Sequence, residues 1–425
     1  MNISKKNSKG KNLRIGILTQ DFLNLSGARD LLRMIIRGLK FRNENEFFLL
    51  MDNSEAEFDL QSNLNPQYVW WQRIVCKVRT NLRKNTKWLY FFPKTKILRH
   101  KAENLLGKNV IDGLNITPYS GMPNGFNNTI SKYKIDVIIP TLTELPTPFV
   151  SYLYDCQHKY FPQNFSTSDI TLRDKLFQKL IDSSCSLIVN SKDTKKDLIK
   201  FFKVDEKKII ALPFAPQLEK EVLEEYPEVR KKYHLPDKYF LISNQFWIHK
   251  SLETALNALK LLIDKGLYDC HVVFTGKMKD SRFPEYVSSL LRLVKDLNLE
   301  NHTTFLGYIP KRDQLEIMKN SCAVIQTTLF EGGPGGGAIY DAVSLGVRSI
   351  VSDISVNKEL PVSNSLLLFE TKNSRDLAEK MILFWNENYI RPDSLSLLRA
   401  HHNSLSAFSD TLYTAINLAL KAQKS

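Results

Sequence analysis

The chain has 425 residues, more than one hydrophobic core usually supports, so its length predicts two domains. Hydrophobic residues make up 43% and charged residues 24%, which excludes a disordered chain. The net charge of +14 lies wholly in the first half, because residues 1–210 hold 34 Lys and Arg against 20 Asp and Glu.

In the first half, short apolar runs alternate with amphipathic stretches, the pattern that builds parallel α/β sheets. The run 13–18 predicts a strand, the residues around Ser26-Gly27-Ala28 a loop, and 29–40 a helix with one apolar face. Further strands are predicted at 47–51, 136–140 and 186–190, and helices at 171–181 and 192–202. Asn190 and Ser191 are good capping residues for the last of these helices.

A basic stretch without acidic residues runs from Gln61 to Ala102, and tryptophan, tyrosine and phenylalanine are interleaved in it. Cations mixed with interfacial aromatics favour contact with an anionic membrane surface through residues 68–101. A solvated segment whose aromatics belong to the core is the alternative, and nucleic acid is the least favoured partner.

Four prolines between Pro213 and Pro236 predict a domain boundary there, and a second α/β series follows it. In this series strands and helices alternate. Strands are predicted at 239–243, 271–276, 303–306, 323–327 and 349–352, and helices at 252–265, 286–297, 313–319, in a segment that ends at Gly346, and at 374–386. Ser251 is a plausible cap for the first of these helices. The tail from about 393 to 421 is predicted to be a helix with one apolar face.

Neither a secretory signal nor an apolar run of about 20 residues is present, so the sequence predicts a soluble protein. The five cysteines are scattered without a C-x-x-C pair, which favours a reducing cytoplasm over a disulfide or zinc framework. G-x-G-x-x-G and P-loop motifs are both absent. The loop after the first strand has only Gly27, which permits close approach of backbone to a ligand.

The strongest chemical signal is a glycine-rich loop between a buried strand and a helix. Glycines occupy five of the six positions 332–337: Gly332, Gly333, Gly335, Gly336 and Gly337. Glycines let backbone amides converge on a ligand, and a helix N-terminus adds a positive dipole end. Glu331 and Asp341 bracket the loop and suit sugar or ribose hydroxyls as acceptors.

A second signal, Asn244-Gln-Phe-Trp-Ile-His-Lys250, follows the first strand of the second series. Lys250 at a helix entry can meet a diphosphate, although such a lysine is more often a solvated surface charge. Asn244, Gln245 and His249 make this a richer set than a simple turn needs.

These motifs resemble the retaining group 1 glycosyltransferases of family 4. The matching pieces are 244–250, Phe330-Glu331-Gly332 with the helix 342–346, and 352–359; in the first half they are Gly27, Asn190-Ser191 and Asp155–Pro162. The resemblance implies the GT-B fold, an α/β architecture of two Rossmann-like doubly wound domains that face each other across a cleft. The implied domains are an acceptor-side domain at 12–215, a nucleotide-sugar domain at 216–395, and a C-terminal helix at 396–425 that returns to the first domain.

The resemblance also implies residue roles. Lys250 would bind the diphosphate, Glu331 the donor sugar, the loop amides sugar and phosphate, Asp341 the ribose, and His158 the reacting sugar. Two departures from the family stand out. Glu331 and Asp341 are separated by nine residues rather than seven, and Gln245 stands where the family usually has an arginine. Extra loop amides or His249 are the candidates to compensate for the missing charge.

We therefore expect a metal-independent glycosyltransferase without a cofactor, acting from a nucleotide-sugar on a glycan or lipid-linked acceptor at the inner face of the cytoplasmic membrane. Two alternatives stay open: a nucleotide-sugar epimerase or hydrolase, and a non-catalytic GT-B-like subunit that binds nucleotide.

Overall fold

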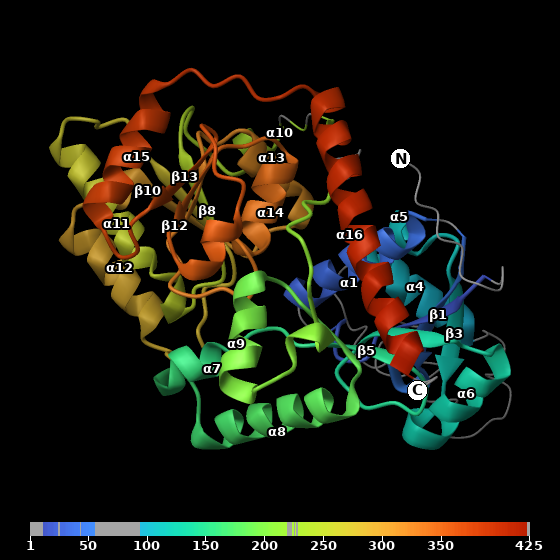
Figure 1. Cartoon of the computed structure of the whole chain (residues 1–425). Helices are drawn as coiled ribbons and strands as arrows, with labels where there is room; N and C mark the ends of the chain where they lie inside the picture. Colours follow the sequence, from blue (N-terminus) through green and yellow to red (C-terminus); the bar gives the residue numbers. More distant parts are fainter. Residues whose placement is uncertain are drawn as a thin grey trace, which may run out of the picture. The chain divides into compact units, whose positions relative to one another are not determined.

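The computed structural model describes residues 12–23, 26–42, 44–55, 94–218, 223–224, 226 and 228–422. The chain forms two compact units (Figure 1). Unit 1 comprises Met1–Leu153, Phe177–Ile188 and Leu412–Ser425, and unit 2 comprises Tyr154–Leu176 and Val189–Thr411. Segments 154–176 and 189–215, which the sequence analysis grouped with the N-terminal domain, thus cluster with unit 2.

The first sheet has seven strands among the described residues, in the order β3-β2-β1-β4-β5-β6-β7. They are β1 (Arg14–Leu18), β2 (Glu46–Asp52), β3 (Asn115–Tyr119), β4 (Val137–Thr141), β5 (Phe149–Tyr152), β6 (Ser186–Val189) and β7 (Ile209–Ala211). Central β1 is parallel to both neighbours, with Ile15 opposite Phe47 and Val137. Because helices cover both faces of such a sheet, β1 is an almost continuous apolar run.

The segments that connect these strands contain α1 (Ser26–Lys40), α4 (Lys94–Leu106), α5 (Lys108–Ile111), α6 (Phe126–Tyr133) and α8 (Thr167–Ser183). The apolar face predicted for α1 is confirmed, since Leu32, Ile35, Ile36 and Leu39 are all fully buried. The loop predicted around Gly27 is wrong, because those residues form the first turn of α1. Periodicity did not reveal β3 or the helices around it, which are short and carry many polar residues.

The second sheet has six parallel strands among the described residues, in the order β10-β9-β8-β11-β12-β13. They are β8 (Phe240–Ser243), β9 (Val272–Thr275), β10 (Thr303–Gly307), β11 (Val324–Gln326), β12 (Ser349–Ser352) and β13 (Leu366–Phe369). All but β13 match predicted strands. The chain leaves β8 toward β9 and β10, then returns to its other side at β11, so the sheet has a topological switch point between β8 and β11.

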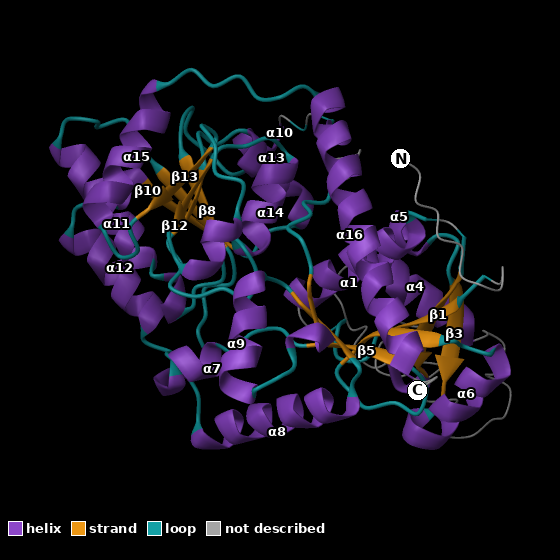
Figure 2. Cartoon of the chain, in the orientation of Figure 1, coloured by secondary structure: helices purple, strands orange, loops and turns teal. Residues whose placement is uncertain are grey.

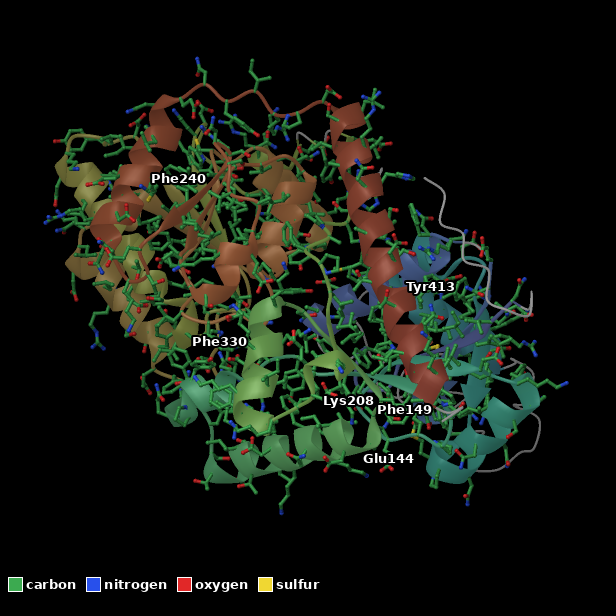
Figure 3. All side chains as sticks on the ribbon, viewed as in Figure 1. Glu144, Phe149, Lys208, Phe240, Phe330 and Tyr413 are labelled. Atoms are coloured by element: carbon green, nitrogen blue, oxygen red, sulfur yellow. The ribbon has the colours of Figure 1, made fainter. Side chains whose placement is uncertain are left out.

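The α-helices that lie wholly within unit 2, among the described residues, are α7 (Gln157–Tyr160), α9 (Lys192–Phe202), α10 (Glu228–Lys232), α11 (Leu252–Asp264), α12 (Tyr286–Asp296), α13 (Lys311–Lys319), α14 (Gly336–Ser344) and α15 (Ser374–Asn386). Figure 2 shows strands and helices of this unit as an α/β layer structure. Phe240, labelled in Figure 3, is fully buried, and its ring lies 5.5 Å from that of Trp385 on α15.

The last helix, α16 (Ser394–Ala422), was predicted to return to the first domain. Its residues up to Thr411 cluster with unit 2, and those from Leu412 cluster with unit 1. There the Tyr413 hydroxyl donates to the Leu39 carbonyl at 2.9 Å and accepts from the Asn45 amide at 2.9 Å. No helix of the described ranges is long and apolar enough to cross a bilayer.

The two predicted helix caps turn out differently. The Ser191 hydroxyl accepts from the Thr194 amide at 2.9 Å at the start of α9, as predicted. Ser251 does precede α11, but its φ of +50° is left-handed and its side chain caps no backbone amide. Its hydroxyl donates instead to the Glu253 carboxylate at 2.9 Å, so this cap prediction is wrong.

Gly276, directly after β9, is held in a conformation that only glycine fits. Its φ is +136°, and an added Cβ would lie 1.9 Å from the carbonyl oxygen of Asn244. We expect Gly276→Ala to lower the free energy of unfolding by about 3 kcal/mol or more, because backbone strain and a backbone clash add. Gly266→Ala is the matched control, with φ +91° and open space around the Cβ. We expect it to cost about 1–2 kcal/mol in urea unfolding; equal losses would contradict the role of the Asn244 contact.

Candidate functional site

The candidate site lies at the carboxyl edge of the second sheet, where β8 and β11 end side by side. The segment after β8 runs to Lys250, and the segment after β11 leads into Glu331. Hydrogen bonds join them: the Thr327 hydroxyl donates to the Lys250 carbonyl at 2.7 Å, and the Leu329 amide donates to the His249 carbonyl at 2.8 Å. The loop that carries the lysine is therefore fixed to the loop that carries the glutamate.

Lys250 and Glu331 form an ion pair in which the ammonium donates to Glu331 Oε1. Their side chains are only 10% and 13% exposed, so the pair is largely shielded from water. Gln326, the last residue of β11, donates from Nε2 to the same carboxylate oxygen at 3.1 Å. An ammonium has three N–H donors, so an anion can bind Lys250 while Glu331 keeps one of them.

The first two glycines of the loop are explained by close neighbours from a distant part of the sequence. The Gly332 carbonyl accepts from the Ser191 hydroxyl at 3.0 Å and from the Thr194 hydroxyl at 2.9 Å. An added Cβ on Gly333 would lie 3.1 Å from the Cβ of Asn190. An added Cβ on Gly332 would lie 2.6 Å from the Tyr154 carbonyl oxygen. The residues at the start of α9 thus hold this loop in place, and side chains at these two positions would collide with their neighbours.

The remaining glycines form the entry to α14. Gly335 has φ +71°, and its amide donates to Asn357 Oδ1 at 2.7 Å. Gly336 and Gly337 are the first residues of α14, rather than part of the loop before it. Asn357 thus satisfies the Gly335 N–H within the protein, and the predicted contacts of the loop amides with sugar and phosphate stay predictions. The glycine run in the sequence did not reveal this partner.

His249 carries no positive charge in this structure at neutral pH. Its side chain is buried, and burial, followed by the charges of Lys250 and Arg282, lowers its pKa to about 2. Its Nδ1 is buried without a hydrogen-bond partner. His249 therefore cannot replace the charge of the missing arginine at Gln245. Nearby, the buried Asp280 carboxylate accepts from the Ile248 amide at 3.0 Å and keeps the turn in place.

His158 lies on α7 in unit 2, with both ring nitrogens near protein side chains. Nε2 lies 2.9 Å from Asp174 Oδ1, and Nδ1 lies 3.5 Å from the Arg173 guanidinium. A carboxylate only accepts and a guanidinium only donates, so the geometry favours the tautomer with hydrogen on Nε2. Burial is the largest cause that lowers the pKa of His158. Its predicted contact with the donor sugar stays a prediction.

The remaining predicted site residues each have surroundings of their own. Asp341, on α14, forms an ion pair with Lys311 of α13. Asn244 donates its backbone amide to the Thr275 carbonyl at 3.0 Å, while its side-chain Nδ2 is buried without a partner. The Gln245 carbonyl accepts from the Trp247 amide at 2.9 Å. Gly27 is exposed in α1 of unit 1.

Sequence reasoning missed Gln326, Asn357 and Asp280, although each positions a residue of the site. Only Gln326 carried a readable signal, because a polar side chain ends an otherwise apolar strand, Val324–Gln326. Within the described part of the chain, no group of three or more His, Cys, Asp or Glu side chains is arranged to hold a metal ion.

Comparison with known proteins gives the class of this fold. Residues 225–396 match the family model described as glycosyl transferases group 1. Among solved structures, Anabaena HepE in complex with UDP-glucose has a TM-score of 0.56 at 15% identity, over 97% of this chain and 100% of that chain. Sucrose-phosphate synthase from Thermosynechococcus elongatus has a TM-score of 0.56 at 13% identity, over 97% and 98%.

A third solved structure, WaaG, described as a glycosyltransferase involved in lipopolysaccharide biosynthesis, has a TM-score of 0.53 at 12% identity, over 96% of this chain and 99% of that chain. No curated protein matched the sequence. The chain therefore has the GT-B fold, with two parallel α/β sheets, as predicted. The segment that matches the group 1 model contains Lys250, Glu331 and the glycine-rich loop.

The neutral His249 predicts a specific acid sensitivity. The pKa of His249 is about 2 in the folded protein and about 6.5 in the unfolded chain. Above pH 6.5 the side chain is therefore neutral in both states, and its titration does not affect the free energy of unfolding. As the pH falls below 6.5, only the unfolded chain binds the proton at His249. The free energy of unfolding therefore falls by about 2 kcal/mol by pH 5. We expect His249→Gln to remove this share of the loss in urea unfolding at pH 7 and pH 5. An equal decline in wild type and variant would show that His249 titrates alike in both states.

Proposed function

We propose that this protein is a glycosyltransferase that moves a sugar from a nucleotide-sugar donor to an acceptor, with retention of configuration. The observation that carries the proposal is the shielded Lys250–Glu331 pair at the topological switch point, next to the glycine-rich entry of α14. In open α/β sheets this edge is where ligands bind. The group 1 match over residues 225–396 and the likeness to glycosyltransferase structures support it.

In this proposal Lys250 and the amides at the N-terminus of α14 stabilise the charge that develops on the departing nucleoside diphosphate. A preorganised cation and helix dipole act strongly in a shielded site. Glu331 keeps one oxygen on Lys250 and Gln326 and uses the other to accept a donor-sugar hydroxyl. The reaction uses these groups and no metal or cofactor.

The acceptor we propose is a glycan or lipid-linked hydroxyl at the inner face of the cytoplasmic membrane. The description of WaaG as acting in lipopolysaccharide biosynthesis supports a surface-glycan role. The basic, aromatic stretch 68–101 supports contact with an anionic membrane, although residues 68–93 lie outside the described residues. In the described part, Arg99 donates to the Leu114 carbonyl at 3.2 Å and Lys101 to the Glu55 carbonyl at 3.0 Å, so these two cations also serve the fold.

The proposed activity predicts nucleoside diphosphate release from a panel of UDP-, GDP- and ADP-sugars with membrane extract as acceptor. We expect extract-dependent release from one donor, and a fall of at least a hundredfold in Lys250→Ala, because one oxyanion-type stabiliser is worth about that factor. Lys260→Ala removes a half-buried lysine of α11 that pairs with Asp264, away from the Lys250–Glu331 pair; it is the matched control and should keep full activity.

Other outcomes of this assay identify the alternatives. Release or donor conversion without extract would point to an epimerase or hydrolase. Bound nucleotide with no release from any donor would identify a non-catalytic subunit.

Membrane contact predicts a separate result in vesicle pelleting. Lys94 and Lys96 are exposed at the start of α4, so we expect Lys94→Glu with Lys96→Glu to reduce binding to anionic vesicles several-fold. Lys132→Glu with Lys134→Glu changes the charge equally on another exposed part of unit 1 and should have little effect. Equal pelleting with anionic and neutral vesicles would overturn the membrane contact.

A further inference from the structure

Gln326 is an unusual residue for its place in the fold. It ends β11, its side chain is fully buried, and its strand neighbours Val324 and Ile325 are also fully buried. A buried amide needs partners for both its oxygen and its nitrogen, because water is not available to satisfy them. An apolar residue would fit a buried strand without this requirement.

The orientation of the Gln326 amide is set by Glu331. Nε2 lies 3.1 Å from Glu331 Oε1, and an ionised carboxylate can only accept a hydrogen bond. The reversed amide would place its own oxygen at that distance from a negative oxygen, which is repulsive. Oε1 therefore points away from Glu331, and it is buried without a donor.

Two more unpartnered polar atoms belong to the loop after β8, the strand next to β11. They are His249 Nδ1 and Asn244 Nδ2, both buried. His249 is 4% exposed and Gln326 is fully buried, so neither side chain can turn into solvent. His249 directly precedes Lys250 in the sequence, and Gln326 lies five residues before Glu331. Their unused hydrogen-bonding capacity points to a polar ligand.

The backbone of α14 leaves space for this arrangement. Gly336, the first residue of α14, has φ +57°, and an added Cβ would lie 3.0 Å from both Gln326 Nε2 and the Glu331 carboxyl carbon. A side chain at this position would displace the amide or the carboxylate. The absence of a side chain at Gly336 therefore allows Gln326 and Glu331 to keep their hydrogen bond.

We propose that Gln326 is a second donor-sugar contact beside Glu331. Its Nε2 holds the Glu331 carboxylate toward Lys250, and its Oε1 accepts a hydrogen bond from a hydroxyl of the sugar. This inference rests on the proposed function and narrows its substrate: the transferred sugar presents neighbouring hydroxyl donors to two fixed acceptors. The diphosphate and nucleoside make no use of Gln326.

The test measures the dissociation constants of Gln326→Met for the nucleotide-sugar that binds wild type, chosen from UDP-, GDP- and ADP-sugars, and for the matching nucleoside diphosphate. Methionine keeps the length and bulk of the side chain and removes both amide atoms. We expect binding of the nucleotide-sugar to weaken at least tenfold, because a contact to a fixed acceptor is lost, and binding of the diphosphate to change less than twofold. Equal weakening of both ligands, or of neither, would overturn the proposal.

Ser349→Ala is the matched control, because Ser349 is also fully buried, carries an unpartnered oxygen, and lies on the adjacent strand opposite Val324. It should leave both dissociation constants unchanged. If wild type itself binds no nucleotide-sugar, the proposed function fails and this inference fails with it. If wild type binds and Gln326→Met binds equally well, only the inference fails.

Gln326→Glu gives a second readout that a merely structural role would not produce. At pH 7 the introduced carboxylate faces Glu331 and has no hydrogen to donate, so sugar-nucleotide binding should be weakened. As the pH falls, one of the two carboxyls takes a proton that can bridge them, and we expect the affinity to recover toward wild type. A variant whose affinity ratio to wild type stays constant from pH 7 to pH 5 would contradict the contact between Gln326 and Glu331.

Discussion

The ion pair between Lys250 and Glu331 is the interaction on which the rest of the candidate site depends. A buried charge is costly unless it is paired and hydrogen-bonded, so the protein surrounds these two side chains with fixed partners. Gln326 donates to the carboxylate, and Thr327 binds the backbone of Lys250. The switch point between β8 and β11 brings the two loops together, which is why a lysine and a glutamate 81 residues apart meet. The same pair offers a ligand one cation and one carboxylate oxygen in a site largely shielded from water.

The glycine-rich loop is shaped by contacts as much as by a ligand. Hydroxyls of Ser191 and Thr194 hold the Gly332 carbonyl, and Asn357 holds the Gly335 amide. These partners come from segments before and after the loop. Each is hydrogen-bonded to a backbone group that would otherwise be available to a substrate. What remains open is the start of α14 beside the ion pair. A loop fixed in this way needs little reorganisation when charge develops on a leaving group.

The segment Asn244–Lys250 contributes one positive charge to the site. Burial keeps His249 neutral, and Gln245 brings no charge, so Lys250 is the cation of the segment Asn244–Lys250. The Arg282 guanidinium lies 5.4 Å from the centre of the Trp247 ring and contributes to the low pKa of His249. Positive charge therefore reaches this region from a second loop, which the spacing of residues around Lys250 did not reveal.

The sequence by itself determined the alternation of strands and helices, the presence of two parallel sheets, and the place of the Lys250 and Glu331 segments directly after buried strands. These features are local, because apolar periodicity and glycine density are written in neighbouring residues. Short or polar elements such as β3 and β13 escaped it. Only the tertiary structure decided that His249 is neutral, that Asn357 occupies the Gly335 amide, and that Gln326 orients Glu331. Burial and hydrogen-bond partners depend on residues far apart in the chain, so no local pattern could have shown them.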